Sequence, residues 1–176
     1  SGAVRWDVSV AGSARGLSVV DGRLLVSTTQ GLIYCFAPPT DAPPRRVTEP
    51  LLDDPYANSQ LSATFRQAAE TILRRTGIRR GYCLVLGCET GQLALELAKR
   101  SELMIYVATP SAERAAIARR ALDAAGIYGV RVCVDECPLE AVPYADYFAN
   151  LIVSETALVT GRWPGDPREA VRMLKP

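Results

Sequence analysis

The sequence predicts an α/β protein in which a small antiparallel sheet precedes a domain built on a parallel sheet. Two observations predict this fold class. First, turn signals divide residues 15–37 into three short runs rich in β-branched and apolar residues. Second, beyond Gly81 the apolar runs do not alternate with polar residues, and each is followed by an amphipathic helical pattern. That arrangement is typical of a parallel sheet covered by helices on both faces.

The N-terminal strands are separated by turn signals. Asp21-Gly22 lies between the first and second runs, and Gln30-Gly31 lies between the second and third. An Asp-Gly pair between such runs is a strong hairpin signal, because both central turn residues need positive φ. Consecutive antiparallel strands are therefore expected at residues 17–20, 24–28 and 32–36, with residues 6–10 as a candidate fourth strand.

Trp6 and the stretch VDGRLLVSTTQGLIYCF together resemble one repeat of a β-propeller of the pyrroloquinoline-quinone-binding-like type. The resemblance is confined to residues 1–37. It implies a single blade, which cannot bury both faces of its sheet, because such repeats are stable as arrays. The blade would therefore pack on another part or belong to a longer propeller. The alternative is a small scaffold sheet with no ligand of its own.

Residues 38–58 form the predicted boundary between the two parts. Prolines crowd together in APPTDAPPRRVTEPLLDDPYANSQ, and no apolar period survives there. Proline removes backbone donors and fixes φ, so this segment is expected to be a linker or an extended arm. The expected division of the chain is therefore 1–37, 38–58 and 59–176.

The part from residue 59 onward is expected to begin with a helix at 60–76, capped by Ser59 or Ser62 and ended by Gly77. Buried strands are then expected at 82–86, 104–108, 130–134 and 148–154. Further helices are expected at 92–100, 112–125 and 167–174. Because crossovers between parallel strands are right-handed, these four strands are expected in the spatial order 3-2-1-4.

Composition restricts the classes of partner. The chain is 48% hydrophobic and has a formal net charge of +1, without the basic stripe that nucleic-acid binding needs. No apolar run reaches the roughly 18 to 20 residues of a membrane span, and the N-terminus lacks the order of a signal peptide. We therefore expect a soluble chain without nucleic-acid or membrane partners, in an unassigned compartment. Its expected protein partner is the remainder of a longer polypeptide or a second copy of itself.

The five cysteines, at positions 35, 83, 88, 133 and 137, are odd in number and lie mostly in apolar runs. This favours buried thiols over a disulfide framework. A zinc site formed by the last four is not expected, because two of them lie within strands and four sulfurs would not converge on one ion. Cys88 and Cys137 are expected as free thiols on loops at one sheet edge, with a disulfide or a redox role as alternatives.

Four stretches follow one another in order: GYCLVLGCETGQLALELAKR, VATPSAERAAIARRALDAAGI, RVCVDECPLEAVPY and YFANLIVSE. With the preceding helix, they make residues 59–176 resemble a class I S-adenosylmethionine-dependent methyltransferase, a Rossmann-like domain. The closing AVRMLKP is similar to the helix before the fifth strand of that family. The resemblance therefore implies a partial domain, truncated at its C-terminus, whose fifth to seventh strands lie outside this sequence.

The same resemblance implies that S-adenosylmethionine binds at the carboxyl edge of the sheet. The residues that would frame the methionine end are Gly87, Cys88, Glu89 and Gly91. Thr109 would face the ribose, and residues 136–139, which include Glu136 and Cys137, would face the adenine. The candidates for contacts with the substrate are Asn150 and Glu155.

The sequence is degenerate with respect to the family pattern. Val85 and Thr109 stand where the family usually has acids, Pro138 stands near a third such position, and Glu89 replaces a glycine. Loss of a charged hydrogen bond costs about 1 to 3 kcal/mol, so three losses could move a micromolar binder past millimolar. Because the chain has no histidine, a catalytic base would be a carboxylate, Lys, Cys or Tyr. Two hypotheses follow: methyl transfer to an unassigned acceptor, or a non-catalytic interaction domain.

Overall fold

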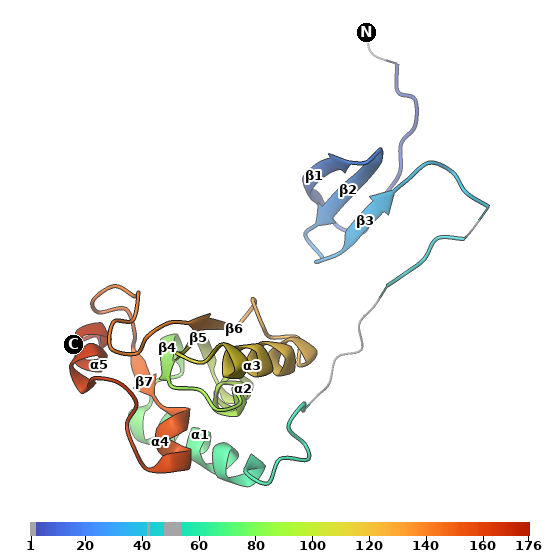
Figure 1. The fold of residues 1–176 in the computed structure, drawn as a ribbon. Helices are drawn as coiled ribbons and strands as arrows, with labels where there is room; N and C mark the ends of the chain where they lie inside the picture. The colour runs from blue at the N-terminus through green and yellow to red at the C-terminus, as the bar shows by residue number, and fades with distance from the viewer. Residues whose placement is uncertain (1–2, 42, 48–53) are drawn as a thin grey trace. The chain divides into compact units, whose positions relative to one another are not determined.

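The computed structural model describes residues 3–41, 43–47 and 54–176. The chain divides into two compact units, Ser1–Thr48 and Glu49–Pro176, whose elements are labelled in Figure 1.

The first unit is a three-stranded antiparallel sheet in the order β1-β2-β3. Its strands are β1 (Ala14–Val20), β2 (Arg23–Thr28) and β3 (Ile33–Phe36), close to the expected ones. Asp21 and Gly22 both have positive φ, at 49° and 70°, as the hairpin signal requires. The expected fourth strand at 6–10 is wrong, because these residues belong to no strand. Trp6 packs instead on the Phe36 ring, with centroids 5.8 Å apart.

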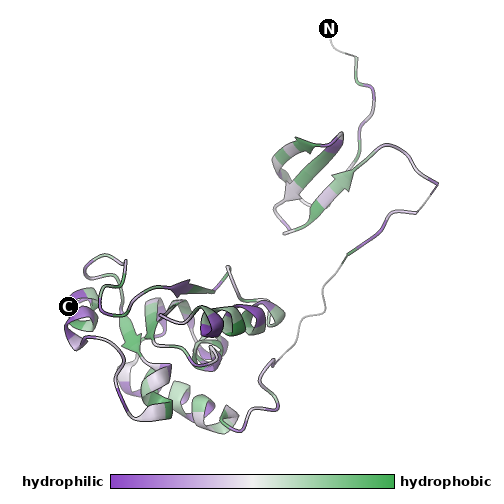
Figure 2. Ribbon diagram, viewed as in Figure 1, coloured by the Kyte–Doolittle hydropathy of each residue, from purple (hydrophilic) through white to green (hydrophobic). Residues whose placement is uncertain are grey.

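Both faces of this small sheet carry apolar side chains, and Figure 2 shows hydrophobic residues along all three strands. Leu17 pairs with Val26 across the sheet, so the two share a face. Val26 is buried but Leu17 is 71% exposed, and on the other face Ile33 is 76% exposed. The Oγ1 atom of Thr28 is buried without a hydrogen-bond partner in the described residues. The unit therefore leaves apolar surface uncovered on both sides.

The second unit is a four-stranded parallel sheet in the order β6-β5-β4-β7, which confirms the expected order 3-2-1-4. Its strands are β4 (Arg80–Leu86), β5 (Glu102–Thr109), β6 (Val132–Glu136) and β7 (Leu151–Val153). Its helices are α1 (Ser62–Thr76), α2 (Gln92–Arg100), α3 (Ala112–Ala124), α4 (Glu155–Thr160) and α5 (Pro167–Met173).

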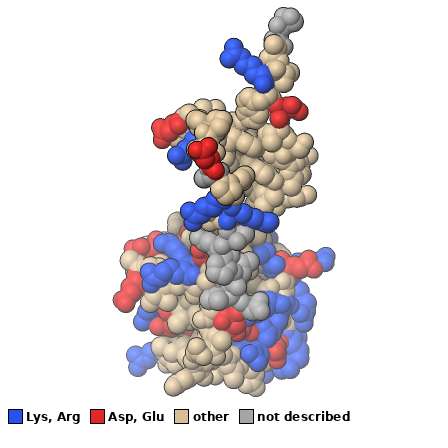
Figure 3. Space-filling model, turned by 90° about the vertical axis from the view of Figure 1, so that its right-hand side faces the viewer, with Lys and Arg blue, Asp and Glu red and all other residues tan. Residues whose placement is uncertain are grey.

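The core of the second unit lies on the two faces of this sheet. Alternate residues of β4 point to opposite faces, and on one face Cys83 and Val85 join a cluster that includes residues of α1, α2 and α3. On the other face, Leu84 and Leu86 pack with the loop after β6 and with α5. Charged side chains of both signs are interspersed on the visible surface (Figure 3). No helix in the described ranges is long and apolar enough to cross a membrane.

Two local features differ from the sequence expectation. Neither predicted serine caps α1 through its side chain, since the N-cap residue is Leu61 and the Ser62 hydroxyl donates to the Tyr56 carbonyl at 2.7 Å. The structure also adds α4, which directly follows β7 and begins at Glu155. Consequently Glu155 is the first residue of a helix whose N-terminus lies at the carboxyl edge of the sheet.

Candidate functional site

The glycine turn, residues 87–91, joins the end of β4 to α2 at the carboxyl edge of the sheet. Gly87 and Gly91 have φ values of 72° and 85°, which only glycine adopts readily. A Cβ atom on Gly87 would lie 2.6 Å from Thr156 Oγ1 and 2.9 Å from Pro164 Cγ. One on Gly91 would lie 2.9 Å from the Cβ of Ala118. Both glycines are thus required by contacts within the protein itself.

Glu155 holds the glycine turn in place. Its Oε1 atom accepts from the backbone N–H groups of Thr90 at 2.7 Å and Gly91 at 3.1 Å, and from the Thr90 hydroxyl at 2.9 Å. Its Oε2 atom accepts from Leu93 N–H at 3.3 Å. The N-cap of α2 is Gly91, which has no side chain to cap the helix, so Glu155 satisfies these otherwise orphan donors from a distant part of the chain.

The Glu155 carboxyl group is fully buried. Burial raises its pKa above the ordinary value, and the hydrogen bonds from Thr90, Leu93 and Gly91 act in the opposite direction. Tyr56 closes the turn from another side, because its hydroxyl donates to the Thr90 carbonyl at 2.6 Å. Glu155, a candidate for contact with substrate, therefore accepts hydrogen bonds from the glycine turn.

Glu89, which stands where the family has a glycine, connects three elements. Its Oε1 atom accepts from Arg114 Nη1 of α3 at 2.9 Å and from Thr156 Oγ1 of α4 at 2.9 Å. Its side chain is 19% exposed. Glu89 therefore ties the glycine turn to the first turns of two neighbouring helices.

The segment between α4 and α5 lies against the carboxyl edge at two points. Pro164 lies over Gly87, and a Cβ atom on Gly165 would lie 2.7 Å from the carbonyl oxygen of Leu139. Leu139 belongs to the loop after β6 that was expected to face an adenine ring. The segment between α4 and α5 therefore contacts both the glycine turn and the loop after β6.

The expected ribose position carries no charge. Thr109 ends β5 and is 1% exposed, and its Oγ1 atom accepts from Ser111 N–H at 3.4 Å. Its carbonyl accepts from Cys137 N–H at 3.0 Å, which joins the loops after β5 and β6. Glu136 is exposed at the end of β6, and the neighbouring Asp135 accepts a short hydrogen bond from the Tyr144 hydroxyl. The single hydroxyl of Thr109 cannot form the bidentate contact expected of a carboxylate.

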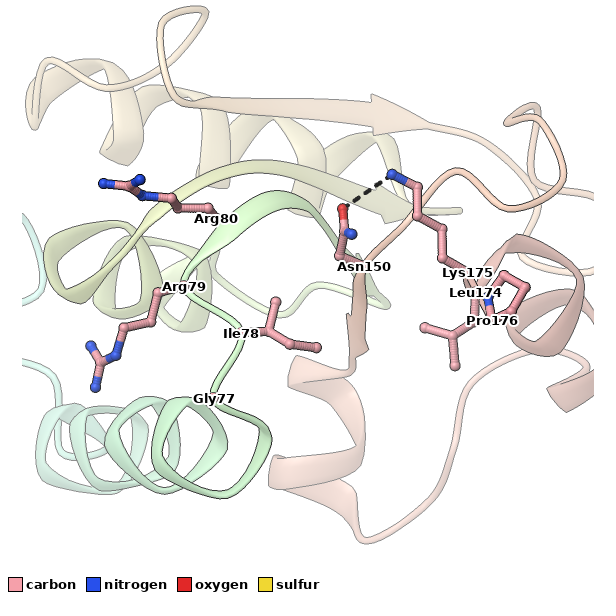
Figure 4. Close-up of a pocket in the computed structure, with 8 residues that line it drawn as sticks. All are labelled: Gly77, Ile78, Arg79, Arg80, Asn150, Leu174, Lys175 and Pro176. Atoms are coloured by element: carbon pink, nitrogen blue, oxygen red, sulfur yellow. Dashed lines mark hydrogen bonds between the residues drawn. The ribbon is translucent and has the colours of Figure 1, made fainter.

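Asn150 lies at the opposite edge of the sheet. It precedes β7, and its Oδ1 atom accepts from Tyr82 N–H at 3.0 Å and from Lys175 Nζ at 3.3 Å. Figure 4 shows it beside Lys175 at a cavity of about 660 Å³ formed with residues 77–80 and 174–176. The two substrate candidates are therefore not brought together, because Asn150 is at the amino edge and Glu155 is at the carboxyl edge.

The cysteines are all free thiols. Burial raises the pKa of Cys88, and it raises the pKa of Cys83 to about 12. Thiols that stay protonated are poor nucleophiles and poor metal ligands. In the described ranges, no group of three or more His, Cys, Asp or Glu side chains is placed to hold a metal ion.

The residues expected to hold S-adenosylmethionine do not fit it in this arrangement of the edge. A ligand can contact only atoms that have accessible surface, yet Cys88 is fully buried and Thr109 nearly so. The space beside Gly87 contains Thr156 and Pro164.

Sequence reasoning missed Tyr56, Arg114, Thr156 and Pro164. Each meets the glycine turn from an element distant along the chain, so no local sequence signal marks it.

Comparison with known proteins gives structural matches only. No known family profile matches the chain, and no curated protein matches it. One similar solved structure is a candidate S-adenosyl-L-methionine-dependent methyltransferase from Methanococcus maripaludis, with 25% identity, a TM-score of 0.61, and coverage of 74% of this chain and 64% of that one. A second is the (4+2)-cyclase SpnF, with 27% identity, a TM-score of 0.53, and coverage of 72% and 46%.

A third similar structure is geranyl diphosphate C-methyltransferase from Streptomyces coelicolor A3(2), in complex with S-adenosyl-L-homocysteine. It is 20% identical, with a TM-score of 0.54 and coverage of 67% of this chain and 45% of that one. The present chain spans less than two thirds of the length of each of these proteins. From the sheet order and these similarities, the second unit has the α/β, Rossmann-like fold of class I S-adenosylmethionine-dependent methyltransferases.

Proposed function

We propose that the second unit is a methyltransferase-type domain that works as a non-catalytic interaction domain. We propose that it does not bind S-adenosylmethionine while Thr156 and Pro164 pack against Gly87. The observation that carries this proposal is the packing of Thr156 and Pro164 against Gly87. These contacts use the space that the glycine turn would otherwise offer to a ligand.

The chemistry at the edge supports the same proposal. Thr109 supplies one buried hydroxyl where a carboxylate would bind both ribose hydroxyls. Glu155 accepts its hydrogen bonds from the glycine turn and not from a ligand. Each missing charged contact weakens binding by about 1 to 3 kcal/mol. Fold alone does not assign methyl transfer, because one fold hosts many activities, and a similar structure is named as a cyclase.

Calorimetric titration with S-adenosylhomocysteine tests this proposal. We expect no heat of binding and no thermal shift up to about 1 mM ligand, which corresponds to less than about 4 kcal/mol of binding free energy. Thr109→Ser is the matched variant, since it keeps the hydroxyl and should behave like the original chain. A dissociation constant below about 100 μM would overturn the proposal.

Methyl transfer from S-adenosylmethionine to an unassigned acceptor is the second candidate function. The retained positive φ values of Gly87 and Gly91 favour it, since they preserve the backbone path of the turn. This function requires the carboxyl edge to open. Formation of S-adenosylhomocysteine from S-adenosylmethionine in the presence of candidate acceptors would support it over the non-catalytic role.

For the first unit, we propose a role as one blade of a larger β-propeller, of the pyrroloquinoline-quinone-binding-like type. The support is its three-stranded antiparallel sheet with apolar side chains exposed on both faces, such as Leu17 and Ile33. Neighbouring blades would cover such faces. Sedimentation at rising concentration tests the need for cover, because a sheet that needs neighbours should make this chain self-associate and Leu17→Lys should reduce that association.

A further inference from the structure

The segment that closes the carboxyl edge has a glycine at each end. Gly161 and Gly165 have φ values of 71° and 70° and flank Arg162, Trp163 and Pro164. Gly161 is the C-cap of α4, and α5 begins two residues after Gly165. The segment therefore joins two helices through two residues that have wide conformational freedom.

Side-chain packing, rather than backbone pairing, holds this segment in place. Within the described ranges, residues 162–165 form no backbone hydrogen bond to the sheet or to the glycine turn. Two contacts of this segment with the edge are Pro164 against Gly87 and Gly165 against Leu139. Trp163 is 40% exposed. A segment with few buried contacts and no ladder hydrogen bonds opens at a lower free energy than the strands beneath it.

Thr156 of α4 also packs against the glycine turn. Thr156, one turn before the segment, bonds the Glu89 carboxylate, which also pairs with Arg114. Because the Arg114 side chain is 47% exposed, solvent screens this pair and its contribution is small. Both contacts lie before Gly161 in the chain or outside residues 161–165, so they can stay in place while the segment moves.

We propose that residues 161–165 form a lid on the carboxyl edge, which turns at Gly161 and Gly165 and, when open, lifts Pro164 from the glycine turn and Gly165 from the loop at Leu139, while Thr156 of α4 stays in place. When the lid is closed, Pro164 occupies part of the space beside Gly87 that S-adenosylmethionine would need. The lid controls access to the edge whether or not any ligand binds there.

A matched pair of glycine variants tests the lid. Gly165→Ala places a methyl group 2.7 Å from the Leu139 carbonyl, whereas Gly161→Ala places one in open space at nearly the same φ. Both variants carry the same backbone strain, but only the first pushes the segment off the edge. The measurement is amide hydrogen exchange of the whole chain, without ligand, followed by mass spectrometry of peptides covering residues 87–91 and 137–140.

In Gly165→Ala we expect exchange at residues 87–91 and 137–140 to be about tenfold faster than in Gly161→Ala, with β5 unchanged in both. Equal exchange in the two variants would overturn the lid. If Gly165→Ala fails to fold, Pro164→Ala serves as the second test of the lid. It removes the contact over Gly87 without adding backbone strain. Faster exchange confined to the turn would then support the lid, and exchange that rises equally in β5, or not at all, would refute it.

Discussion

The Glu155 carboxylate lies 3.1 Å from the backbone nitrogen of Gly91, 64 positions earlier in the chain. The same oxygen accepts from the backbone and the hydroxyl of Thr90. A single buried side chain in the first turn of α4, just after β7, therefore fixes the turn that follows β4. These two neighbouring strands are joined at their carboxyl ends by side-chain chemistry as well as by the sheet ladder.

Replacement of Glu155 should strongly destabilise the second unit. Glu155→Ala leaves the N–H groups of Thr90, Gly91 and Leu93 buried without their acceptor, and an unsatisfied buried donor costs about 1 to 3 kcal/mol. We expect a loss of about 3 kcal/mol or more in the free energy of unfolding, measured by urea denaturation. Glu155→Gln keeps one acceptor oxygen and should lose less. Equal stability of the two variants would contradict the capping role.

Stability should also depend on pH through Glu155. Burial raises the pKa of this carboxyl group above its ordinary value of 4.5, so the native state holds the proton more tightly than the unfolded chain. This contribution is fully present below about pH 4.5 and is lost as pH rises through the raised pKa. Denaturation curves between about pH 4 and about pH 8 should show this fall in the original chain but not in Glu155→Gln. If the original chain and Glu155→Gln had parallel profiles of stability against pH, this contribution of Glu155 would be excluded.

Two glycines with nearly equal φ should respond differently to alanine. Gly77 and Gly87 have φ values of 70° and 72°, but a Cβ atom meets nothing within 4 Å at Gly77 and meets Thr156 and Pro164 at Gly87. Gly77→Ala should cost about 1 kcal/mol from backbone strain alone. Gly87→Ala should cost about 3 kcal/mol, because overpacking adds to the strain. Thermal unfolding of both variants measures the difference, and equal costs would mean that the contacts at Gly87 are loose.

The pair between Glu89 and Arg114 should contribute little to stability. It is partly exposed, and such pairs contribute about 0 to 1 kcal/mol. A double-mutant cycle with Glu89→Gln and Arg114→Gln should give a coupling energy below about 1 kcal/mol. A coupling energy above about 2 kcal/mol would contradict this expectation and would mean that the pair is shielded from solvent.

The sequence was sufficient for most of the second unit, because its strands and helices carry strong local signals. Apolar runs such as the one ending at Leu86, helical periods, and caps such as Gly77 depend on neighbours within a few residues. The handedness of crossovers then determined the strand order. The expected strand at 6–10 failed because a strand is defined by a partner, and Trp6 found an aromatic ring instead.

The candidate site was harder to predict because its contacts join distant parts of the chain. The family pattern located Gly87, Gly91 and Thr109 at the carboxyl edge, but it could not show that Pro164 covers this edge. It also made Glu155 a candidate for contact with substrate, but it could not show that Glu155 accepts four hydrogen bonds from the turn and from α2. The short α4 carries too few residues for a helical period to be recognised.

The distance along the chain between Glu155 and the turn that it caps has a consequence for the order of folding. Contacts between residues far apart in sequence require large loops to close, so they form late and slow the folding reaction. The turn after β4 can form early, but its N–H groups gain their acceptor only when β7 has docked beside β4. The first turn of the parallel sheet to be synthesised is therefore among the last to be completed.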